Sequence, residues 1–226
     1  MWLLDQPSLE KPSATIDTKV IPGLSNHVVL TGGTAGSSID SGQAHLAIEY
    51  PPGIGPLDHI SSSLGSFSED IIPVDWLSLA EHIRVLDAES VVVVHGTDTM
   101  AWTASALSFL LGDLPLCVIL TGASLPPDHK DSDWLDNLAL ARKAAGVMPA
   151  GVWVAFRGKL HRGTRVHKQS TQDVFQSVGI QPDATEVGNE LLLNLGGSLP
   201  RLKTAPSPRL DRGIHALRLH PGANLD

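Results

Sequence analysis

The stretch VVVVHGTDTM at residues 91–100 decides the fold, because four β-branched residues run without interruption into a hydroxyl and a carboxylate. A continuous apolar run without polar alternation is typical of a strand buried on both faces of a parallel sheet. In open α/β sheets, ligands bind just beyond the carboxyl ends of such strands. The sequence therefore places Thr97 and Asp98 at a position where a ligand is expected.

A second predicted strand ends in the same way. Residues 27–30 (HVVL) lead into residues 31–38 (TGGTAGSS), a loop of glycines and hydroxyl side chains. Glycines let backbone N–H groups approach a ligand closely, and threonine and serine supply nucleophiles or hydrogen-bond donors. We expect the two loops to face one cleft.

Apolar patterning predicts strands that alternate with helices along the chain. The strands are expected at 28–30, 91–94, 117–120 and 152–156, and the helices at 74–86, 99–111 and 133–145. This alternation predicts an α/β fold, a mostly parallel sheet with crossover helices in a Rossmann-like three-layer sandwich. The helix from Thr99 is apolar nearly all round, so we expect it to be buried. Beyond Phe156, glycine-rich and charged pieces predict a hairpin that carries Lys168.

Composition limits the class of protein. With 226 residues, of which 42% are hydrophobic, the chain can bury one good α/β core. A net charge of -8 and no basic stripe argue against a nucleic-acid partner. No stretch is long enough to span a membrane, and the first residues do not form a signal peptide. The single cysteine, Cys117, lies in an apolar strand and suits a reducing compartment, so we expect a cytoplasmic protein.

Metal, nucleotide and serine-hydrolase chemistries lack their signatures. The histidines at 161, 167, 215 and 220 show no paired helical spacing, and a single cysteine cannot form a thiolate cluster. The chain has no G-x-S-x-G elbow, Walker A sequence or G-x-G-x-x-G motif. We therefore expect no metal and no cofactor, and we interpret His95 as a packing residue at a strand end.

The two threonine loops, 31–34 (TGGT) and 95–99 (HGTDT), resemble in order those of the bacterial-type L-asparaginase family of threonine amidohydrolases. Further segments resemble this family at 68–70 (SED), 121–126 (TGASLP), 132–138 (SDWLDNL) and 162–168 (RGTRVHK). The resemblance implies hydrolysis of L-asparagine to L-aspartate and ammonia through an acyl-threonine intermediate. L-glutamine is the alternative substrate.

The resemblance also implies catalytic roles for four residues. Thr34 is the expected acylating nucleophile, and Thr97 is expected to work with Asp98 and Lys168. A threonine hydroxyl is a weak nucleophile until a neighbour accepts its proton, and positive neighbours favour the neutral, basic form of a lysine. Basic residues flank Lys168 at Arg162, Arg165 and His167. Without the resemblance, this segment also fits a solvated basic hairpin.

Five residues are expected to bind the substrate. By resemblance, Ser68 and Glu69 hydrogen-bond the α-carboxylate and α-ammonium of an amino-acid amide, and Asp98 also faces the ammonium. Thr97 and Ala123 complete the set. A serine before two acids and a later proline is also a helix N-terminus signature, so we expect the backbone at Ser68 to cap the following helix.

Three departures from the family pattern bear on activity. Ala35 follows the second threonine of the first loop where the family has a bulky aliphatic residue, and Tyr50 does not match the family's flap tyrosine. Residues 214–222 resemble the opening strand of the family's smaller C-terminal domain, most of which is missing. We therefore expect exposed apolar surface, assembly into a homo-oligomer, and reduced activity.

The sequence divides into four expected segments, and the departures leave two alternative functions open. The expected division is an N-terminal extension at 1–26, an α/β domain at 27–201, a linker at 202–213 and the start of a truncated domain at 214–226. One alternative is a catalytically impaired or inactive ligand-binding domain. Another is the ammonia-releasing subunit of a tRNA-dependent amidotransferase, which a basic extension would favour, and residues 1–26 are not basic.

Overall fold

The fold is described from a computed structural model of the chain. The structure describes residues 14–16, 27–40, 43–46, 51–54, 59–170, 174–178, 183–188 and 190–194. Tyr50, the linker at 202–213, the domain start at 214–226 and most of the extension at 1–26 lie outside these residues. Ala14–Ile16 forms a strand within that extension.

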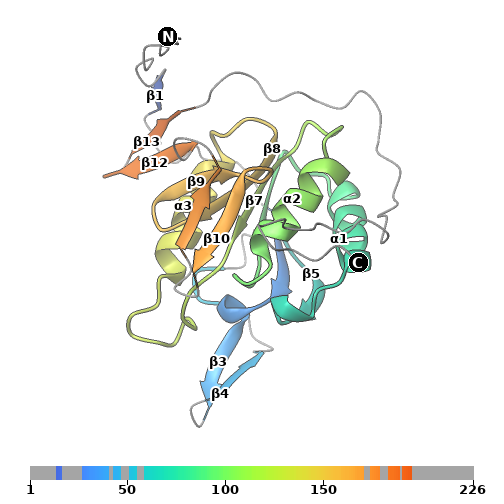
Figure 1. Cartoon of the computed structure of the whole chain (residues 1–226), viewed down its shortest axis with the longest axis vertical. Coiled ribbons are helices and arrows are strands. Elements are labelled where there is room, and N and C mark those ends of the chain that lie inside the picture. The colour runs from blue at the N-terminus through green and yellow to red at the C-terminus, as the bar shows by residue number, and fades with distance from the viewer. Residues whose placement is uncertain are drawn as a thin grey trace, which may run out of the picture.

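The described residues form the following elements (Figure 1). The helices are α1 (Pro73–Arg84), α2 (Met100–Leu110) and α3 (Trp134–Ala145), with 3-10 turns η1 (Thr34–Gly36) and η2 (Ser68–Asp70). The strands are β1 (Ala14–Ile16), β2 (His27–Gly32), β3 (Ser37–Asp40), β4 (Gln43–Leu46), β5 (His59–Ser66), β6 (Ser90–Val94), β7 (Cys117–Thr121), β8 (Gly151–Phe156), β9 (Lys159–Arg162), β10 (Val166–Ser170), β11 (Val174–Ser177), β12 (Ala184–Val187) and β13 (Glu190–Leu193).

Nine of these strands form one sheet in the order β1-β13-β12-β9-β8-β7-β6-β2-β5. The five strands from β8 to β5 pair in parallel, and the pairs from β8 to β1 are antiparallel. The predicted α/β fold with a mostly parallel sheet is thus confirmed, and the seven predicted strands and helices are all present. The antiparallel edge and the β3–β4 hairpin, which projects from the body in Figure 1, were not predicted.

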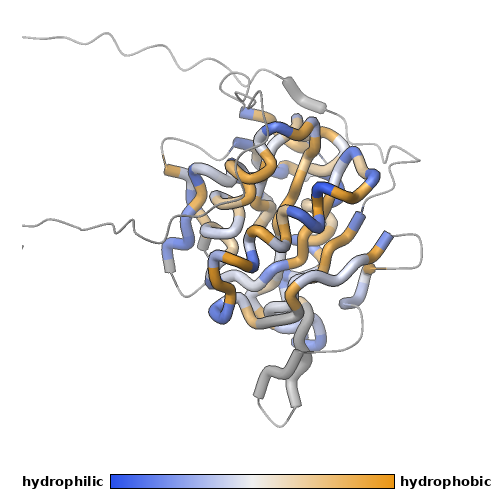
Figure 2. The backbone as a smooth tube through the Cα atoms, turned by 90° about the vertical axis from the view of Figure 1, so that its right-hand side faces the viewer, coloured by the Kyte–Doolittle hydropathy of each residue, from blue (hydrophilic) through white to orange (hydrophobic). Residues whose placement is uncertain are grey.

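Helices cover both faces of the parallel part of the sheet. Val91 and Val93 of β6 pack with α1 and α2, whereas Val92 and Val94 pack with α3. Successive side chains of a strand point to opposite faces, so an unbroken apolar run is the pattern that a two-sided core requires. Figure 2 shows apolar residues along the central strands and a mixture of polar and apolar residues along the helices.

The β10–β11 hairpin packs on the same side of the sheet as α2. Val166 of β10 and Phe175 of β11 belong to the core beneath α2, and the ring of Phe175 meets that of Phe156 edge-on at 5.0 Å between centroids. Gly163, just before β10, lies so close to α2 that an added Cβ would stand 2.6 Å from Ser108 Oγ. This packing fixes where the hairpin carries its polar side chains.

The prediction that α2 is buried nearly all round is wrong for its outer side. Met100, Ala104 and Leu107 face the sheet, but Trp102 and Phe109 are 67% and 63% exposed. Positions 102 and 109 are two helical turns apart and therefore share the side that points away from the sheet. None of the described elements covers this side of α2. Apolar composition alone cannot predict whether a neighbouring element covers a helix.

The prediction that Ser68 caps the helix at 74–86 is also wrong. Helix α1 begins at Pro73, and the carboxylate of Asp75 accepts a hydrogen bond from the Ile72 backbone N–H at 2.8 Å. Ser68 instead begins the separate turn η2, where its carbonyl accepts a hydrogen bond from Thr99 Oγ1 at 2.7 Å. Pro73 and Asp75 supply the start signals of α1, so the serine is left for another role.

Among the helices that the structure describes, none combines the length and apolar character needed to cross a membrane.

Two buried histidines make the stability of this fold depend on pH. Burial lowers the pKa of His95 to about 4, and burial with the charges of Lys159 and His167 lowers the pKa of His161 to about 4. Below about pH 6.5 the unfolded chain binds protons that the folded chain excludes, so stability present above that pH is lost as the pH falls toward 4. We expect His161→Gln to lose about 2 kcal/mol less stability than the wild type between pH 7 and 4.5.

Urea unfolding at several pH values measures this difference. His59→Gln is the comparison variant, because His59 is an exposed strand residue and the same substitution there leaves the burial of His161 unchanged. Parallel pH profiles for His161→Gln and the wild type would contradict the prediction.

Candidate functional site

The carboxyl ends of three neighbouring parallel strands meet at one edge of the sheet. The Thr31 hydroxyl of β2 donates a hydrogen bond to the carbonyl of Val94 at the end of β6, at 2.8 Å. The backbone N–H of His95, just past β6, donates to the carbonyl of Thr121 at the end of β7, also at 2.8 Å. The loops that follow these strands therefore start from fixed positions relative to one another.

Glycines let these loops come closer than any other residue would allow. Gly33 has φ +81°, and an added Cβ there would collide with the backbone of Gly96. A Cβ at Gly96 would lie 2.6 Å from both Cβ and Oγ of Ser68. Side chains cannot fit between backbones at such separations. The loop carrying Thr34, the loop carrying Thr97 and the turn η2 are thus packed against one another.

The β10–β11 hairpin brings Lys168 to this edge. Lys168 lies two residues after Val166 on β10, so the pleat directs both side chains to the side of the strand that faces α2. The β10–β11 pairing shifts register between Lys168 and Ser170. Such irregularities commonly re-aim a side chain next to a functional site. Helix α2 begins directly after the 97–99 loop, so the amine reaches that loop.

Lys168 contacts both members of the Thr97–Asp98 pair. Its Nζ donates to Thr97 Oγ1 at 3.0 Å and to Asp98 Oδ1 at 2.8 Å. Thr97 is buried, the Lys168 side chain is 15% exposed, and the Asp98 side chain is 61% exposed. The hydroxyl is therefore held in a largely dry position, with the amine between it and a carboxylate that reaches water.

Two of the three basic neighbours expected around Lys168 have other partners. Arg162 pairs with the buried carboxylate of Asp183 at 3.5 Å, and Arg165 Nε donates to the carbonyl of Val178 at 3.0 Å. A carboxylate, that of Asp98, lies 2.8 Å from Lys168 Nζ. Alternation along β10 and its preceding turn sends these side chains in different directions, although they are neighbours in sequence.

The remaining predicted site residues differ in how far they are exposed. Thr34 begins η1 directly after Gly33 and is partly buried. Ser68 is buried against Gly96, whereas Glu69 on the same turn is exposed. Ala123 is fully buried, and its side chain packs in the core beneath α3.

His95 is a buried packing residue rather than an exposed base. It is fully buried, and its Nδ1 lies 2.7 Å from the carbonyl of Gly96. Because a carbonyl can accept but not donate, Nδ1 carries the hydrogen. Burial of the ring lowers the pKa of His95 to about 4, so the imidazole is neutral at pH 7. It fixes the peptide that leads into Thr97.

A groove of about 440 Å³ opens beside the Lys168–Asp98 pair, between α2 and β10. Its walls are formed by Ala101, Trp102 and Ser105 of α2 and by Val166, His167 and Gln169 of β10. The pair is therefore reachable from solvent on this side. An acidic, a basic and a hydroxyl group at hydrogen-bond distance provide the parts needed to move a proton to or from a bound polar molecule.

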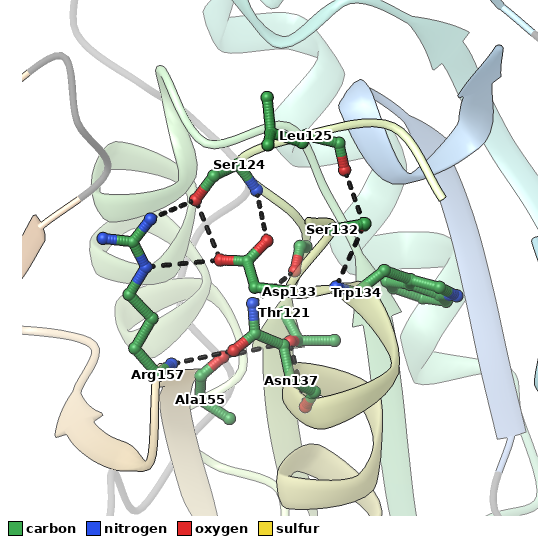
Figure 3. A network of polar contacts seen from close by, with 10 residues as sticks. Thr121, Ser124, Leu125, Ser132, Asp133, Trp134, Asn137, Ala155 and Arg157 are labelled. Atoms are coloured by element: carbon green, nitrogen blue, oxygen red, sulfur yellow. Dashed lines mark hydrogen bonds and ion pairs between the residues drawn. The ribbon is translucent and has the colours of Figure 1, made fainter. Parts of the chain in front are cut away.

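Sequence reasoning gave no role to three residues that hold the loop after β7. Figure 3 shows Asp133, the residue before α3, and Arg157 of the β8–β9 turn contacting Ser124, and Asn137 of α3 contacting the backbone N–H of Arg157. The available signal was the turn itself, because Arg157-Gly158 separates two strand patterns by two residues. That signal predicts a hairpin but not what its side chain contacts.

Comparisons with known proteins point to one family. The family model described as Asparaginase, N-terminal, matches residues 26–195. The L-asparaginase of Thermococcus kodakarensis is 35% identical over 156 residues, which are 67% of this chain and 48% of that protein. L-asparaginase 1 of Escherichia coli K12 is 38% identical over 159 residues, 68% of this chain and 44% of that protein.

Two further comparisons extend the match. A subunit of the glutamyl-tRNA(Gln) amidotransferase of Methanococcus maripaludis strain C6 is 36% identical over 204 residues, 80% of this chain and 48% of that protein. The solved structure of the thermostable L-asparaginase from Thermococcus kodakarensis aligns with a TM-score of 0.76 and 30% identity, covering 88% of this chain and 64% of that one. The chain spans about half the length of the curated relatives it matches.

Proposed function

This chain belongs to the asparaginase family, and on that premise we propose that it hydrolyses the side-chain amide of L-asparagine, with L-glutamine as the alternative substrate. The observation that carries the proposal is the contact of Lys168 Nζ with Thr97 Oγ1 at 3.0 Å and Asp98 Oδ1 at 2.8 Å. The β10–β11 hairpin thus brings an amine from 70 residues further along the chain to the carboxylate beside a strand-end hydroxyl. The relatives named L-asparaginase support the choice of amide.

The proposed reaction has two halves. Thr34 Oγ1 attacks the amide carbonyl, its proton passes to the leaving nitrogen, and ammonia departs to leave an acyl-threonine ester. Water then attacks the ester, giving L-aspartate and the free Thr34 hydroxyl. Thr97 and Lys168 take up and return the proton in this exchange, and the Asp98 carboxylate stabilises the ammonium that forms on Lys168.

The surrounding residues fit the recognition of a small amino-acid amide. The buried hydroxyl of Ser68 lies against the Gly96 backbone, and the exposed carboxylate of Glu69 follows it on the same turn. We assign Ser68 to the α-carboxylate of the substrate, and Glu69 together with Asp98 to its α-ammonium. We assign a backbone contact with the substrate to Ala123, which follows β7 at the same edge of the sheet.

A second candidate function follows from the match to the amidotransferase protein, which extends over 204 residues. In that case the chain releases ammonia for a partner protein instead of acting alone. The two candidates differ in what an isolated chain does. Asparagine hydrolysis by the purified chain supports the first, and glutamine hydrolysis that depends on an added partner supports the second.

Replacement of the proposed base tests the proposed function. We expect Lys168→Met to lower kcat for asparagine by about 10²- to 10⁴-fold, because a thioether cannot accept a proton. The fold should persist, since the Asp98 carboxylate left behind is largely exposed. Ammonia release from asparagine and glutamine measures activity, and circular dichroism measures folding. Lys159→Met, which removes an exposed lysine on β9, is the control.

Wild-type turnover by folded Lys168→Met would show that this amine is not the base. If the wild-type chain hydrolyses neither amide but binds L-aspartate, the alternative of an inactive ligand-binding domain replaces the proposal. Calorimetry with L-aspartate measures this binding.

Covalent labelling tests the assignment of the nucleophile. A reactive aspartate analogue should form a stable ester with Thr34, and Thr34→Ala should remain unlabelled, because Thr97 is engaged by Lys168. Mass spectrometry of the labelled peptide identifies the residue. Thr164→Ala, at an exposed position in the turn between β9 and β10, should be labelled as fast as the wild type. Label on Thr97 would exchange the two assigned roles.

We further propose that the chain forms a homo-oligomer through the outer side of α2. Trp102 and Phe109 lie exposed on that side, and the groove at Lys168 borders it. Burial of two large aromatic side chains favours association. Sedimentation equilibrium should give a dimer or larger species for the wild type and a monomer for Trp102→Glu/Phe109→Glu. Val85→Glu, at an exposed valine after α1, is the control, and a monomeric wild type would contradict this proposal.

A further inference from the structure

The two residues that flank Ala123 are held by side chains from distant parts of the chain. Asn137 of α3 is buried, and its Nδ2 donates to the carbonyl of Gly122 at 3.0 Å. The Oδ1 of the same amide accepts from the backbone N–H of Arg157 at 2.8 Å. Both ends of this amide are therefore occupied, and it joins the β8–β9 turn to the end of β7.

The other flank of Ala123 is held by a carboxylate (Figure 3). Asp133 accepts two hydrogen bonds from Ser124, one from its backbone N–H and one from its hydroxyl, each at 2.8 Å. The guanidinium of Arg157 lies over the same group, with Nε 3.3 Å from Asp133 Oδ2 and Nη2 2.9 Å from Ser124 Oγ. Ala123 thus sits between two residues that cannot shift independently of Asn137 and Arg157.

This loop is in turn packed against the segment that leads to Thr97. A Cβ at Gly122 would collide with the carbonyl of His95, and the His95 N–H donates to the carbonyl of Thr121 at 2.8 Å. His95 is two residues before Thr97. A displacement of the Gly122 peptide therefore changes its position relative to the Thr97 hydroxyl, and displacements of about 1 Å near reacting groups can cost about 10²-fold in rate.

The turn that carries Arg157 is a two-residue hairpin between β8 and β9. Phe156 pairs with Lys159, and Arg157 and Gly158 have φ values of +45° and +72°. Positive φ at both central residues is the conformation of the type I′ turns that such hairpins favour. The hairpin therefore accounts for the backbone of Arg157, and the guanidinium projects from this turn to the loop that carries Ala123.

We propose that Asn137 and Arg157 are positioning residues that fix the Ala123 peptide, in the loop packed against the segment that leads to Thr97, and so determine which amide length is accepted. The inference rests on the proposed function. Glutamine is one methylene longer than asparagine, and a rigid peptide at the reacting end discriminates between amides that differ by this length. A loosened peptide accommodates both, so discrimination falls together with kcat.

Two variants and a matched control test this inference. Asn137→Asp keeps the acceptor for the Arg157 N–H but replaces the donor to Gly122 with a carboxylate oxygen. Arg157→Ala removes contacts of a side chain that is 48% exposed, so the fold should persist if Asn137→Asp fails to fold. The control is Asp136→Asn, a carboxylate-to-amide change at the exposed neighbouring position of α3.

Hydrogen exchange without substrate and steady-state kinetics provide separate measurements. In both variants the Ser124 amide should exchange at least about 10-fold faster, kcat should fall about 10-fold or more, and the kcat/KM ratio of the two amides should move toward one. Asp136→Asn should match the wild type in all three. Unchanged Ser124 exchange overturns the inference, as does faster exchange with wild-type kcat and amide ratio.

Failure of the proposed function has a different signature. A wild-type chain that hydrolyses neither amide overturns both the proposed function and the role in amide discrimination. The exchange measurement still separates the two ideas in that case, because faster Ser124 exchange in Arg157→Ala supports the hold on Ala123 without any turnover.

Discussion

The close approach of Gly33 to the backbone of Gly96 is the constraint on which the rest of the site depends. Parallel strands bring their carboxyl ends to one edge, but ordinary side chains would keep the following loops several ångströms apart. Here glycines remove the Cβ atoms at the points of contact, and Ser68 fills the space beside Gly96. The threonines that follow these two glycines are consequently carried by adjoining loops of a rigid sheet.

The second requirement is a cation, and the hairpin supplies it by hydrophobic packing. Val166 and Phe175 are buried beneath α2, and this packing holds β10 against α2. Lys168 then points toward the loop before α2 and meets Thr97 and Asp98. Apolar contacts thus position a polar group, and the Asp98 carboxylate, open to water, compensates its charge.

Periodicity predicted the central strands and helices because the spacing of their apolar residues shows whether one face or both faces are buried. The valines of β6 alternate between the two cores, and the sequence pattern reflects that directly. Periodicity gave wrong predictions where the composition of a segment does not show which element packs against it. The aromatic residues Trp102 and Phe109 of α2 match a buried helix in composition, yet the described residues leave their side of the helix open. Ser68 likewise matched a cap, but Asp75 performs that task.

The sequence by itself determined the parallel sheet, the two threonine loops at its edge and the adjacency of Thr97 and Asp98, because these follow from local apolar runs and the glycines that end them. The tertiary structure decided the rest. Lys168 reaches Thr97 from 71 residues away, and Arg157 reaches Ser124 from 33 residues away. No local pattern specifies such contacts, since they depend on how the hairpins pack on α2 and α3. The arrangement of the site is therefore a consequence of packing between elements.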